Sequence, residues 1–329
     1  MRPDGFAAQL IRALARDSAP YDSRRRAPTT LGPIAAAAAM VLVVTVGVPA
    51  IRGRFTGVEP LATPRPVTIP SVSVDATLAA KVPSDIRARG RLVVGVAPTY
   101  EPSDFLDADG RTVIGFDVDL FNAVAGKLGM TPQWQSAPRQ DMIQGAISAK
   151  YDVSVSSLTI TMDRLRYVTM VSYFVAGAQW AAKAGAEISA DDACGRKVAV
   201  RTATVEVDDL NVRSRTCTDA GKAKITIDRY PTLADVTNAV LTGKDDAMIA
   251  ESPASAYAVK QADGRLRLVG NMYGSTAYGY AVSKNRTDLA DVLKQAIEAL
   301  IADGTYEAIL AKWGVQTGGI AVPTVRPPA

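Results

Sequence analysis

The stretch RLVVGV at residues 91–96 is a short, continuous apolar run near the start of the folded part of the chain. Such a run is typical of a strand that is buried on both faces, as in a parallel sheet covered by helices. Apolar side chains then recur at helical spacing, at Phe116, Leu120, Val124 and Leu128. We therefore expect a central strand followed by a helix that packs on the sheet.

The same alternation continues to the end of the chain. Further strands are predicted at residues 151–155, 197–200, 246–250 and 278–283. The apolar positions between Leu289 and Leu300 follow the i, i+3, i+4, i+7 rule of an amphipathic helix. Gly304 ends that pattern, and a second short helix is predicted over residues 306–313. Strands that alternate with helices indicate an α/β fold.

The composition excludes several classes of function. The 329 residues are 48% hydrophobic and 21% charged, which is typical of a folded chain long enough for two domains, and they include no histidine. Ser-His-Asp catalysis, Cys-His catalysis and metal sites built on imidazole are therefore excluded. Two cysteines cannot form a structural zinc site. We expect no metal and no cofactor.

The net charge of +4 is concentrated at the amino terminus. Residues 1–54 carry eight Arg and three Asp, a local charge of +5, so residues 55–329 sum to −1. The main body therefore lacks the basic surface that nucleic-acid binding requires, and we expect no nucleic-acid partner. Twenty-five uncharged residues separate Arg26 from Arg52, and the apolar run 31–51 has the length of a transmembrane helix.

The positive-inside rule orients this apolar run. Three arginines at residues 24–26 precede it, which predicts a cytoplasmic tail (1–30), a single transmembrane helix (31–51) and a folded domain on the extracytoplasmic face of the cell membrane. The alternative is a cleaved signal peptide. The long charged region and the poor small-residue cleavage site at residues 48–50 argue against cleavage.

Two features fit a tethered domain outside the cytoplasm. Residues 52–85 contain closely spaced prolines and no sustained apolar period, which predicts an extended linker. Cys194 and Cys217 are the only cysteines, and a disulfide between them can form and persist outside the cytoplasm. Two unrelated buried thiols are the alternative.

Five short motifs carry the strongest functional signal in the chain. They are LVVGV (92–96), GFDVDL (115–120), KYD (150–152), SLTITMDR (157–164) and DGTY (303–306). In order and spacing, over about residues 86–314, the chain resembles the polar amino-acid substrate-binding proteins of ABC importers, solute-binding family 3. The cysteine pair also resembles the disulfide of the tethered members of that family.

The resemblance implies a two-lobed, periplasmic-binding-protein-like fold (type II), preceded here by one transmembrane helix. Lobe 1 would be discontinuous, with residues 86–178 and 280–314, and lobe 2 would be inserted into it, with residues 179–279. We expect residues 315–329 to form a disordered tail. The resemblance also implies a monomer that closes on a free amino acid and delivers it to an ABC permease.

A free amino acid carries a carboxylate and an ammonium, and a site that removes both from water must supply opposite charges for them. Arg164 matches the family's carboxylate-binding arginine, while Ser157 and Thr159 would add a backbone amide and a hydroxyl. Glu251 stands where most members have the aspartate that binds the ammonium. The alternatives are a surface salt bridge for Arg164 and helix-capping roles for the other three residues.

The residues expected to set specificity depart from the family pattern. Tyr100 matches the aromatic residue that lines the ligand site, and Asp104 matches a recurring acidic neighbour. Arg139 stands where a tryptophan or phenylalanine is common, and Thr204 keeps one hydroxyl of the usual Gly-Thr-Thr turn. Arg139, with Arg201 near that turn, favours a ligand with an acidic or amide side chain; two solvated surface arginines are the alternative.

Two other classes of function remain open at this point. A dehydratase or lyase on the same scaffold would need only a carboxylate acid or base, which Asp104 or Glu251 could supply. A sensor would dock its closed lobes on a separate signalling protein. Intact Arg164 and Thr159, with no Gly-x-Ser-x-Gly or Ser-x-x-Lys signature, favour an importer subunit that is not an enzyme and has no catalytic residues.

Overall fold

The computed structural model of the protein describes residues 69–326. The predicted cytoplasmic tail (1–30) and the predicted transmembrane helix (31–51) lie outside this range. Among the described residues, no helix combines the length and the apolar character that a membrane span requires. The membrane anchor therefore stays a prediction from the sequence.

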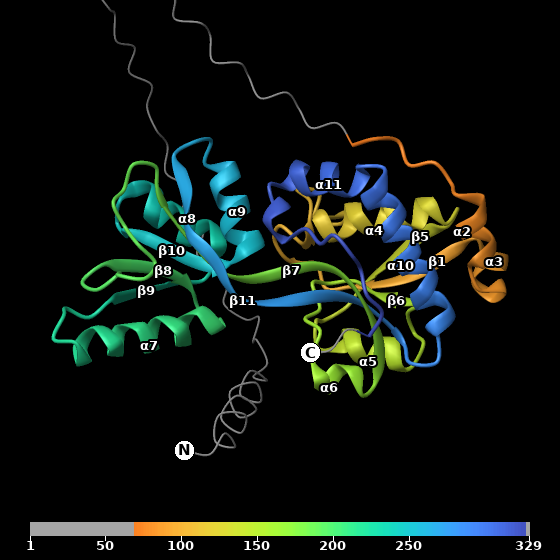
Figure 1. Cartoon of the computed structure of the whole chain (residues 1–329), viewed down its shortest axis with the longest axis horizontal. Helices are drawn as coiled ribbons and strands as arrows, with labels where there is room; N and C mark the ends of the chain where they lie inside the picture. Colours follow the sequence, from red (N-terminus) through yellow and green to blue (C-terminus); the bar gives the residue numbers. More distant parts are fainter. Residues whose placement is uncertain (1–68, 327–329) are drawn as a thin grey trace, which may run out of the picture. The chain divides into compact units, whose positions relative to one another are not determined.

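The helices and strands form two groups, here called lobe 1 and lobe 2 (Figure 1). Lobe 1 contains α2 (Ala76–Lys81), α3 (Ser84–Arg89), β1 (Arg91–Val96), β2 (Thr99–Tyr100), β3 (Asp104–Leu106), β4 (Val113–Ile114), α4 (Phe116–Lys127), β5 (Thr131–Ser136), α5 (Asp141–Ile147), β6 (Val153–Ser154), α6 (Met162–Leu165), α10 (Thr287–Ala302), α11 (Thr305–Trp313) and the 3-10 helix η1 (Gln316–Gly318). Lobe 2 contains β8 (Lys197–Arg201), α7 (Val205–Asp219), β9 (Thr226–Tyr230), α8 (Leu233–Thr242), β10 (Ala247–Glu251) and α9 (Ser252–Gln261). Two long strands, β7 (Val168–Lys183) and β11 (Leu266–Ser283), belong to both lobes.

The main sheet has eight strands in the order β5-β1-β6-β11-β7-β10-β8-β9. The strands β5, β1 and β6 are parallel, as are β10, β8 and β9, but β7 and β11 run antiparallel to each other and to their outer neighbours. The expectation of a parallel sheet is therefore correct for the outer strands and wrong for the two central ones. One strand carries the chain out of lobe 1 and the other brings it back, so the two run in opposite directions.

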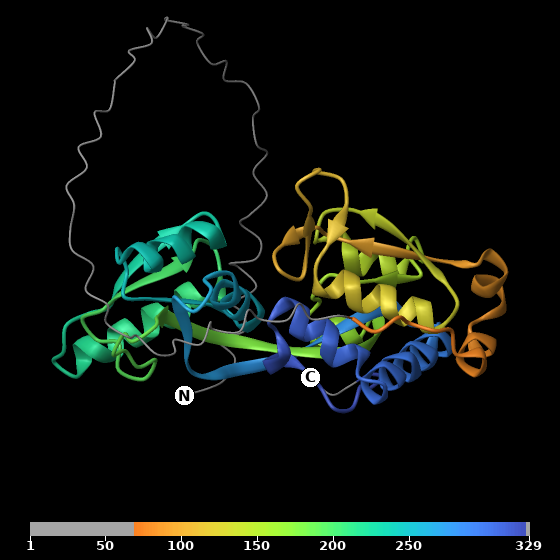
Figure 2. The ribbon, with the colours of Figure 1, turned by 90° about the horizontal axis from the view of Figure 1, so that it is seen from above.

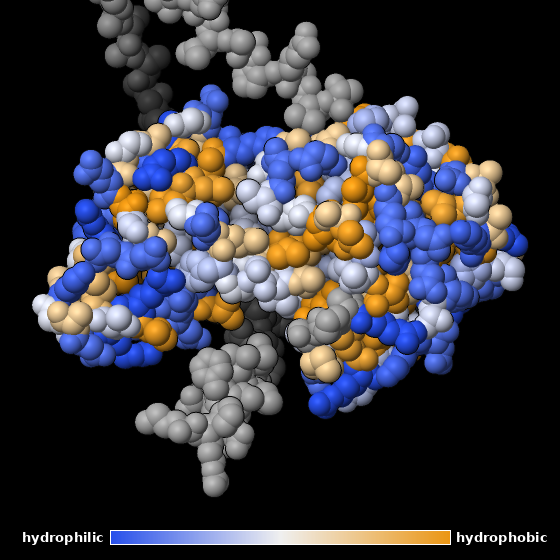
Figure 3. All heavy atoms as spheres, viewed as in Figure 1, coloured by the Kyte–Doolittle hydropathy of each residue, from blue (hydrophilic) through white to orange (hydrophobic). Residues whose placement is uncertain are grey.

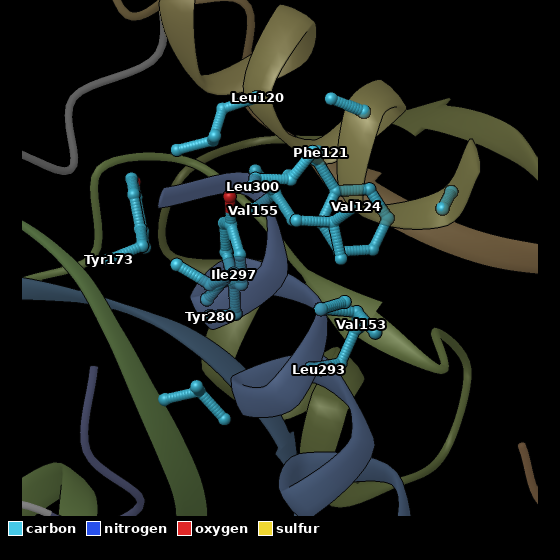
Figure 4. Close-up of a cluster of buried hydrophobic side chains, with 14 of the residues drawn as sticks. Leu120, Phe121, Val124, Val153, Val155, Tyr173, Tyr280, Leu293, Ile297 and Leu300 are labelled. Carbon is cyan, nitrogen blue, oxygen red and sulfur yellow. The ribbon is translucent and has the colours of Figure 1, made fainter. Parts of the chain in front are cut away.

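Each lobe has its own buried core. The largest cluster of lobe 1 lies between α4, α10 and the strands β6, β7 and β11 (Figure 4). The helical side chains labelled there that have no exposed surface are Leu120, Phe121, Val124, Leu293, Ile297 and Leu300. Lobe 2 buries Val207 and Leu210 of α7 on one cluster and Val236 and Met248 on another. The helices predicted from apolar spacing therefore cover the sheet as expected.

The turn before α4 explains the Gly-Phe-Asp motif. Gly115 has a φ of 137°, and a Cβ atom there would lie 2.1 Å from the carbonyl oxygen of Ser103. Only glycine allows this approach. The Asp117 N–H then donates to the Ser103 carbonyl oxygen (3.0 Å), so the start of α4 packs against the chain that leads into β3. This contact places Asp117 in the interior of lobe 1.

The strands β7 and β11 run side by side from one lobe to the other (Figures 1 and 2). Buried residues of β7 change from the lobe 1 cluster to the lobe 2 cluster between Ala176 and Trp180. Gly177 lies there, and a Cβ atom on it would be 2.4 Å from the Tyr273 carbonyl oxygen of β11. The register between the strands shifts three times between Val269 and Gly279. Such irregular pairing bends strands locally.

The folded body extends further at both ends than the sequence predicts. The helix α2 lies inside the predicted linker (52–85), and its Leu78 is buried in the lobe 1 core. At the other end, residues 315–326 form a strap on β7 instead of the predicted disordered tail. The Ser172 N–H donates to the Thr324 carbonyl oxygen (2.9 Å). Both segments are short and gain their structure from partners distant in the sequence.

The helix α7 lies at the surface of lobe 2, and Figure 3 shows hydrophilic residues over most of it. Its carboxyl-terminal end is fixed by a disulfide between Cys217 and Cys194, with an S–S distance of 2.03 Å. This bond confirms the pairing predicted from the sequence, and the alternative of two unrelated thiols is wrong.

Candidate functional site

Tyr100 of β2 and Glu251 of β10 meet between the two lobes. The Tyr100 hydroxyl donates a hydrogen bond to the Glu251 carboxylate. Burial, and then the Glu251 charge, raise the pKa of Tyr100 well above its usual value, so the phenol keeps its proton. The guanidinium carbon of Arg201 lies 5.4 Å from the centre of the same ring. The structure therefore brings together residues from both lobes that the sequence placed at the ligand site.

Glu251 directly precedes α9, where its side chain could have capped the helix. The structure has no hydrogen bond from this side chain to the α9 backbone, and Pro253 in the first turn has no N–H to be capped. The capping alternative for Glu251 is therefore wrong. Its carboxylate binds Tyr100 of the other lobe instead.

Glu206 adds a second carboxylate on the lobe 2 side, and the sequence analysis missed it. It lies in the first turn of α7, is only 4% exposed, and has its pKa raised mainly by burial. The nearby charge of Glu251 raises this pKa further and that of Arg201 lowers it, but both effects are weaker than burial. The only signal in the sequence was a glutamate near a helix start, and that position is ordinarily solvated.

Thr204 immediately precedes α7, as the predicted turn requires. Its hydroxyl donates to the carbonyl oxygen of Arg201 (3.0 Å). In the structure this hydroxyl therefore stabilises the turn between β8 and α7, and that turn carries Arg201 on one side and Glu206 on the other.

Arg164 lies on lobe 1, in α6, and is partly buried. One N–H of its guanidinium donates to the carbonyl oxygen of Thr159 (2.6 Å). Burial, and then the charge of nearby Arg139, lower the pKa of Arg164. In residues 69–326 no carboxylate forms a salt bridge with it, unlike the surface pairing that the sequence left open. Its other donors are suited to a ligand carboxylate.

Arg139 is exposed, yet its guanidinium is held by the protein backbone. It donates to the carbonyl oxygens of Ser156 (2.7 Å) and Ser157 (3.1 Å). These two bonds fix the cation near Arg164. We call Arg139 and Arg164 the cationic pair of lobe 1, and Glu206 and Glu251 the acidic pair of lobe 2.

Ser157 does not present its donors to the space between the lobes. The residue is fully buried, and both its N–H and its hydroxyl donate to one oxygen of Asp117, at 2.6 Å and 3.0 Å. Both donors that Ser157 was expected to offer a ligand are therefore used by Asp117 in this structure. The helix cap of α6 is Thr161, whose hydroxyl accepts from the Arg164 N–H (3.2 Å), so neither Ser157 nor Thr159 is the cap.

Asp104, expected at the ligand site, is instead buried in lobe 1 near Asp117. Its two oxygens have no hydrogen-bond partner among the described residues. Burial, and then the Asp117 charge, raise the pKa of Asp104 to about 9. Burial also raises the pKa of Asp117, to about 6, but hydrogen bonds from Tyr173 and Ser157 oppose the shift. Burial therefore favours the neutral form of Asp104, whereas the hydrogen bonds to Asp117 favour its ionised form.

Comparison with known proteins gives one matching family. Residues 92–316 match the model of the bacterial extracellular solute-binding proteins, family 3. The arginine-binding protein ArgT of Corynebacterium glutamicum is 35% identical over 242 residues, which are 73% of this chain and 79% of that protein. The L-cystine-binding protein TcyJ of Escherichia coli is 28% identical over 232 residues, 69% of this chain and 84% of that protein.

A solved structure shares both sequence and fold. It is an ancestral cationic amino acid solute-binding protein, 26% identical, with a TM-score of 0.60; the alignment covers 73% of this chain and 100% of that chain. The family match over residues 92–316 spans both lobes, which agrees with the two-lobed architecture described above.

Proposed function

Because the chain belongs to the bacterial extracellular solute-binding proteins of family 3, we propose that it captures a cationic amino acid and delivers it to an ABC permease. The proteins of this family bind solutes for transport and are not enzymes. The observation that carries this proposal is the separation of charge between the lobes. The cationic pair lies on lobe 1 and the acidic pair on lobe 2.

The α-carboxylate and α-ammonium of an amino acid match these two groups. Arg164 offers a planar fork of donors that can bind a carboxylate in a bidentate manner, with Arg139 beside it. Glu251 would accept from the ammonium, and Tyr100 already orients that carboxylate. Thr159 would contribute a hydroxyl next to Arg164, since its carbonyl oxygen already holds that guanidinium.

The surroundings of the two arginines change the expected ligand side chain. The sequence favoured an acidic or amide side chain because Arg139 and Arg201 were expected to face it. Arg139 is held by two backbone carbonyl oxygens beside Arg164, on the side proposed for the α-carboxylate, and Arg201 lies over Tyr100 and near Glu206, so we expect neither cation to face the ligand side chain. The buried Glu206 adds a negative charge for the side chain. This favours a guanidinium or ammonium side chain, as in the arginine that ArgT is named for.

Delivery would depend on motion of the lobes and on location. Arg164 and Glu251 can hold one ligand together only when the lobes approach, so the ligand would shift the population toward a closed state. The predicted anchor (31–51) would keep the domain beside its permease, and we propose that the protein acts as a monomer. Small-angle scattering of the full chain in detergent should give a smaller radius of gyration with saturating L-arginine; an unchanged profile would contradict hinge closure.

A ligand screen tests the proposed function. The full chain should be used, because the strap (315–326) and α2 pack on lobe 1 and a shorter fragment would remove them. In a thermal-shift screen against the twenty amino acids, we expect L-arginine and L-lysine to give the largest increases in Tm, and titration calorimetry should then give a 1:1 complex. Stabilisation by L-glutamate or L-glutamine alone would restore the acidic or amide ligand, and no shift with any amino acid would contradict the proposal.

A further inference from the structure

Asp104 and Asp117 are chemically identical side chains in different surroundings. Asp117 accepts three hydrogen bonds, from the Ser157 N–H, the Ser157 hydroxyl and the Tyr173 hydroxyl (2.7 Å). Asp104 accepts none from the described residues, although it has no exposed surface. We infer that Asp117 is a positioning residue whose carboxylate shapes the turn that aims the cationic pair, and that Asp104 beside it has no such role.

Ser157 has an unusual backbone conformation. Its φ is +45°, in the left-handed region that side chains other than glycine rarely adopt. The serine is held there because one oxygen of Asp117 receives both its N–H and its hydroxyl. A carboxylate oxygen accepts both donors and its charge strengthens both hydrogen bonds, whereas the oxygen of an amide would accept them without that charge.

Backbone carbonyl oxygens connect Ser157 and its neighbours to the cationic pair. The turn formed by residues 156–164 presents three carbonyl oxygens to arginines: those of Ser156 and Ser157 hold Arg139, and that of Thr159 holds Arg164. A change in the backbone at Ser157 therefore alters the position of both guanidinium groups. Asp117 acts on the ligand through this turn without touching it, and the inference rests on the proposed function of the cationic pair.

Other side chains also face the Asp104 and Asp117 carboxyls. Arg139 lies on the side of the turn, and its charge favours the ionised forms of Asp104 and Asp117. Tyr173 of β7 donates to Asp117, and its ring stacks on Tyr280 of β11, with centres 4.1 Å apart (Figure 4). Tyr278 of β11 has a buried hydroxyl on the same side. One charge can be stabilised by these groups, and two adjacent charges cannot.

The test compares the same isosteric change at the two positions. Asp117→Asn should weaken binding of L-arginine by roughly tenfold or more, because a neutral amide oxygen replaces the charged acceptor of both Ser157 donors and an NH₂ group replaces the acceptor of the Tyr173 hydroxyl. Asp104→Asn should leave the dissociation constant within about threefold, since an amide replaces a carboxyl that is already neutral. Calorimetry at pH 7.5, with circular dichroism to verify folding, gives both values. Equal effects of the two changes would overturn the inference.

The pH profile separates positioning from a merely structural role. Protonation of Asp117 should weaken L-arginine binding as the pH falls from 7 to 5, and Asp104→Asn should keep that dependence. In Asp117→Asn, the affinity for L-arginine should change less between pH 7 and pH 5, because only the contribution of Glu206 would remain. Should Asp117→Asn fail to fold, Tyr173→Phe removes one donor to Asp117 and should move the loss of affinity to higher pH. A profile unchanged by these variants would overturn the inference.

A measurement without ligand distinguishes this inference from the proposed function. Amide hydrogen exchange in residues 157–164 should become faster in Asp117→Asn than in the wild type and should not change in Asp104→Asn. Unchanged exchange in Asp117→Asn would refute the positioning role, whatever the ligand is. Faster exchange in a protein that binds no amino acid would support the positioning role and refute the proposed function.

Discussion

The two sides of the candidate site carry opposite charges and hold them in different ways. On lobe 1, the backbone carbonyl oxygens of one turn position both Arg139 and Arg164. On lobe 2, Glu251 ends a strand and Glu206 begins a helix, so the two carboxylates are placed independently. The cationic pair therefore depends on one local network, whereas the loss of one member of the acidic pair leaves the other carboxylate in place.

The largest effect is expected from Arg164→Ala. It should weaken amino-acid binding by about 3 kcal/mol, roughly a hundredfold or more, because the ligand carboxylate loses its cation in a desolvated site. Calorimetry measures the loss. The matched control is Arg166→Ala, which removes a surface arginine whose side chain is 72% exposed and should leave affinity unchanged. Near wild-type affinity in folded Arg164→Ala would remove this residue from the site.

Glu251→Gln should have a smaller effect, about 2 kcal/mol or roughly thirtyfold in affinity. The negative charge for the ligand ammonium is lost, but Glu206 remains nearby and buried. Glu187→Gln changes an exposed glutamate of the same lobe and serves as the control in the same calorimetric series. A loss as large as that of Arg164→Ala would show that the acidic pair has no mutual compensation.

Glu206→Gln should change specificity more than overall affinity. We expect L-arginine binding to weaken by about tenfold, with little change for L-glutamine, because Glu206 is proposed to face the charged side chain and not the α-ammonium. Paired titrations with both ligands measure the ratio. Equal losses for the two ligands would place Glu206 at the ammonium instead.

Asp104→Asn should leave binding nearly unchanged and alter only the dependence of stability on pH. The pKa of Asp104 is raised in the folded state, so the wild type is favoured below about pH 4 and loses that stability as the pH rises toward 9. The asparagine variant lacks this loss. Its stability relative to the wild type should therefore increase from pH 5 to pH 8, by at most about 1.4 kcal/mol per pH unit.

Urea unfolding of the two proteins at pH 5 and pH 8 measures this difference. The Asp117 carboxyl, whose pKa is also raised, remains in both proteins and contributes equally to a first approximation. The same stability difference at both pH values would mean that Asp104 does not carry a proton in the folded protein at neutral pH.

Apolar periodicity was sufficient to predict most elements of the fold. The runs at residues 91–96 and 197–200 became β1 and β8, and the pattern from Leu289 to Leu300 became α10. Local patterns suffice there because a period of two or 3.6 residues already specifies which face is buried. The paired cysteines and the charges at Arg164 and Glu251 were also visible, since few residue types can perform those roles.

Tertiary structure decided the features that depend on partners distant in the chain. The antiparallel centre of the sheet follows from two crossings between lobes, and the strap forms only because β7 offers it Val171 and Ser172. In the site, no local pattern predicts the burial of Glu206, the raised pKa of Asp104 or the hydrogen bonds from Ser157 to Asp117. Desolvation and hydrogen bonding depend on what surrounds a group in space, and the sequence states only what precedes and follows it.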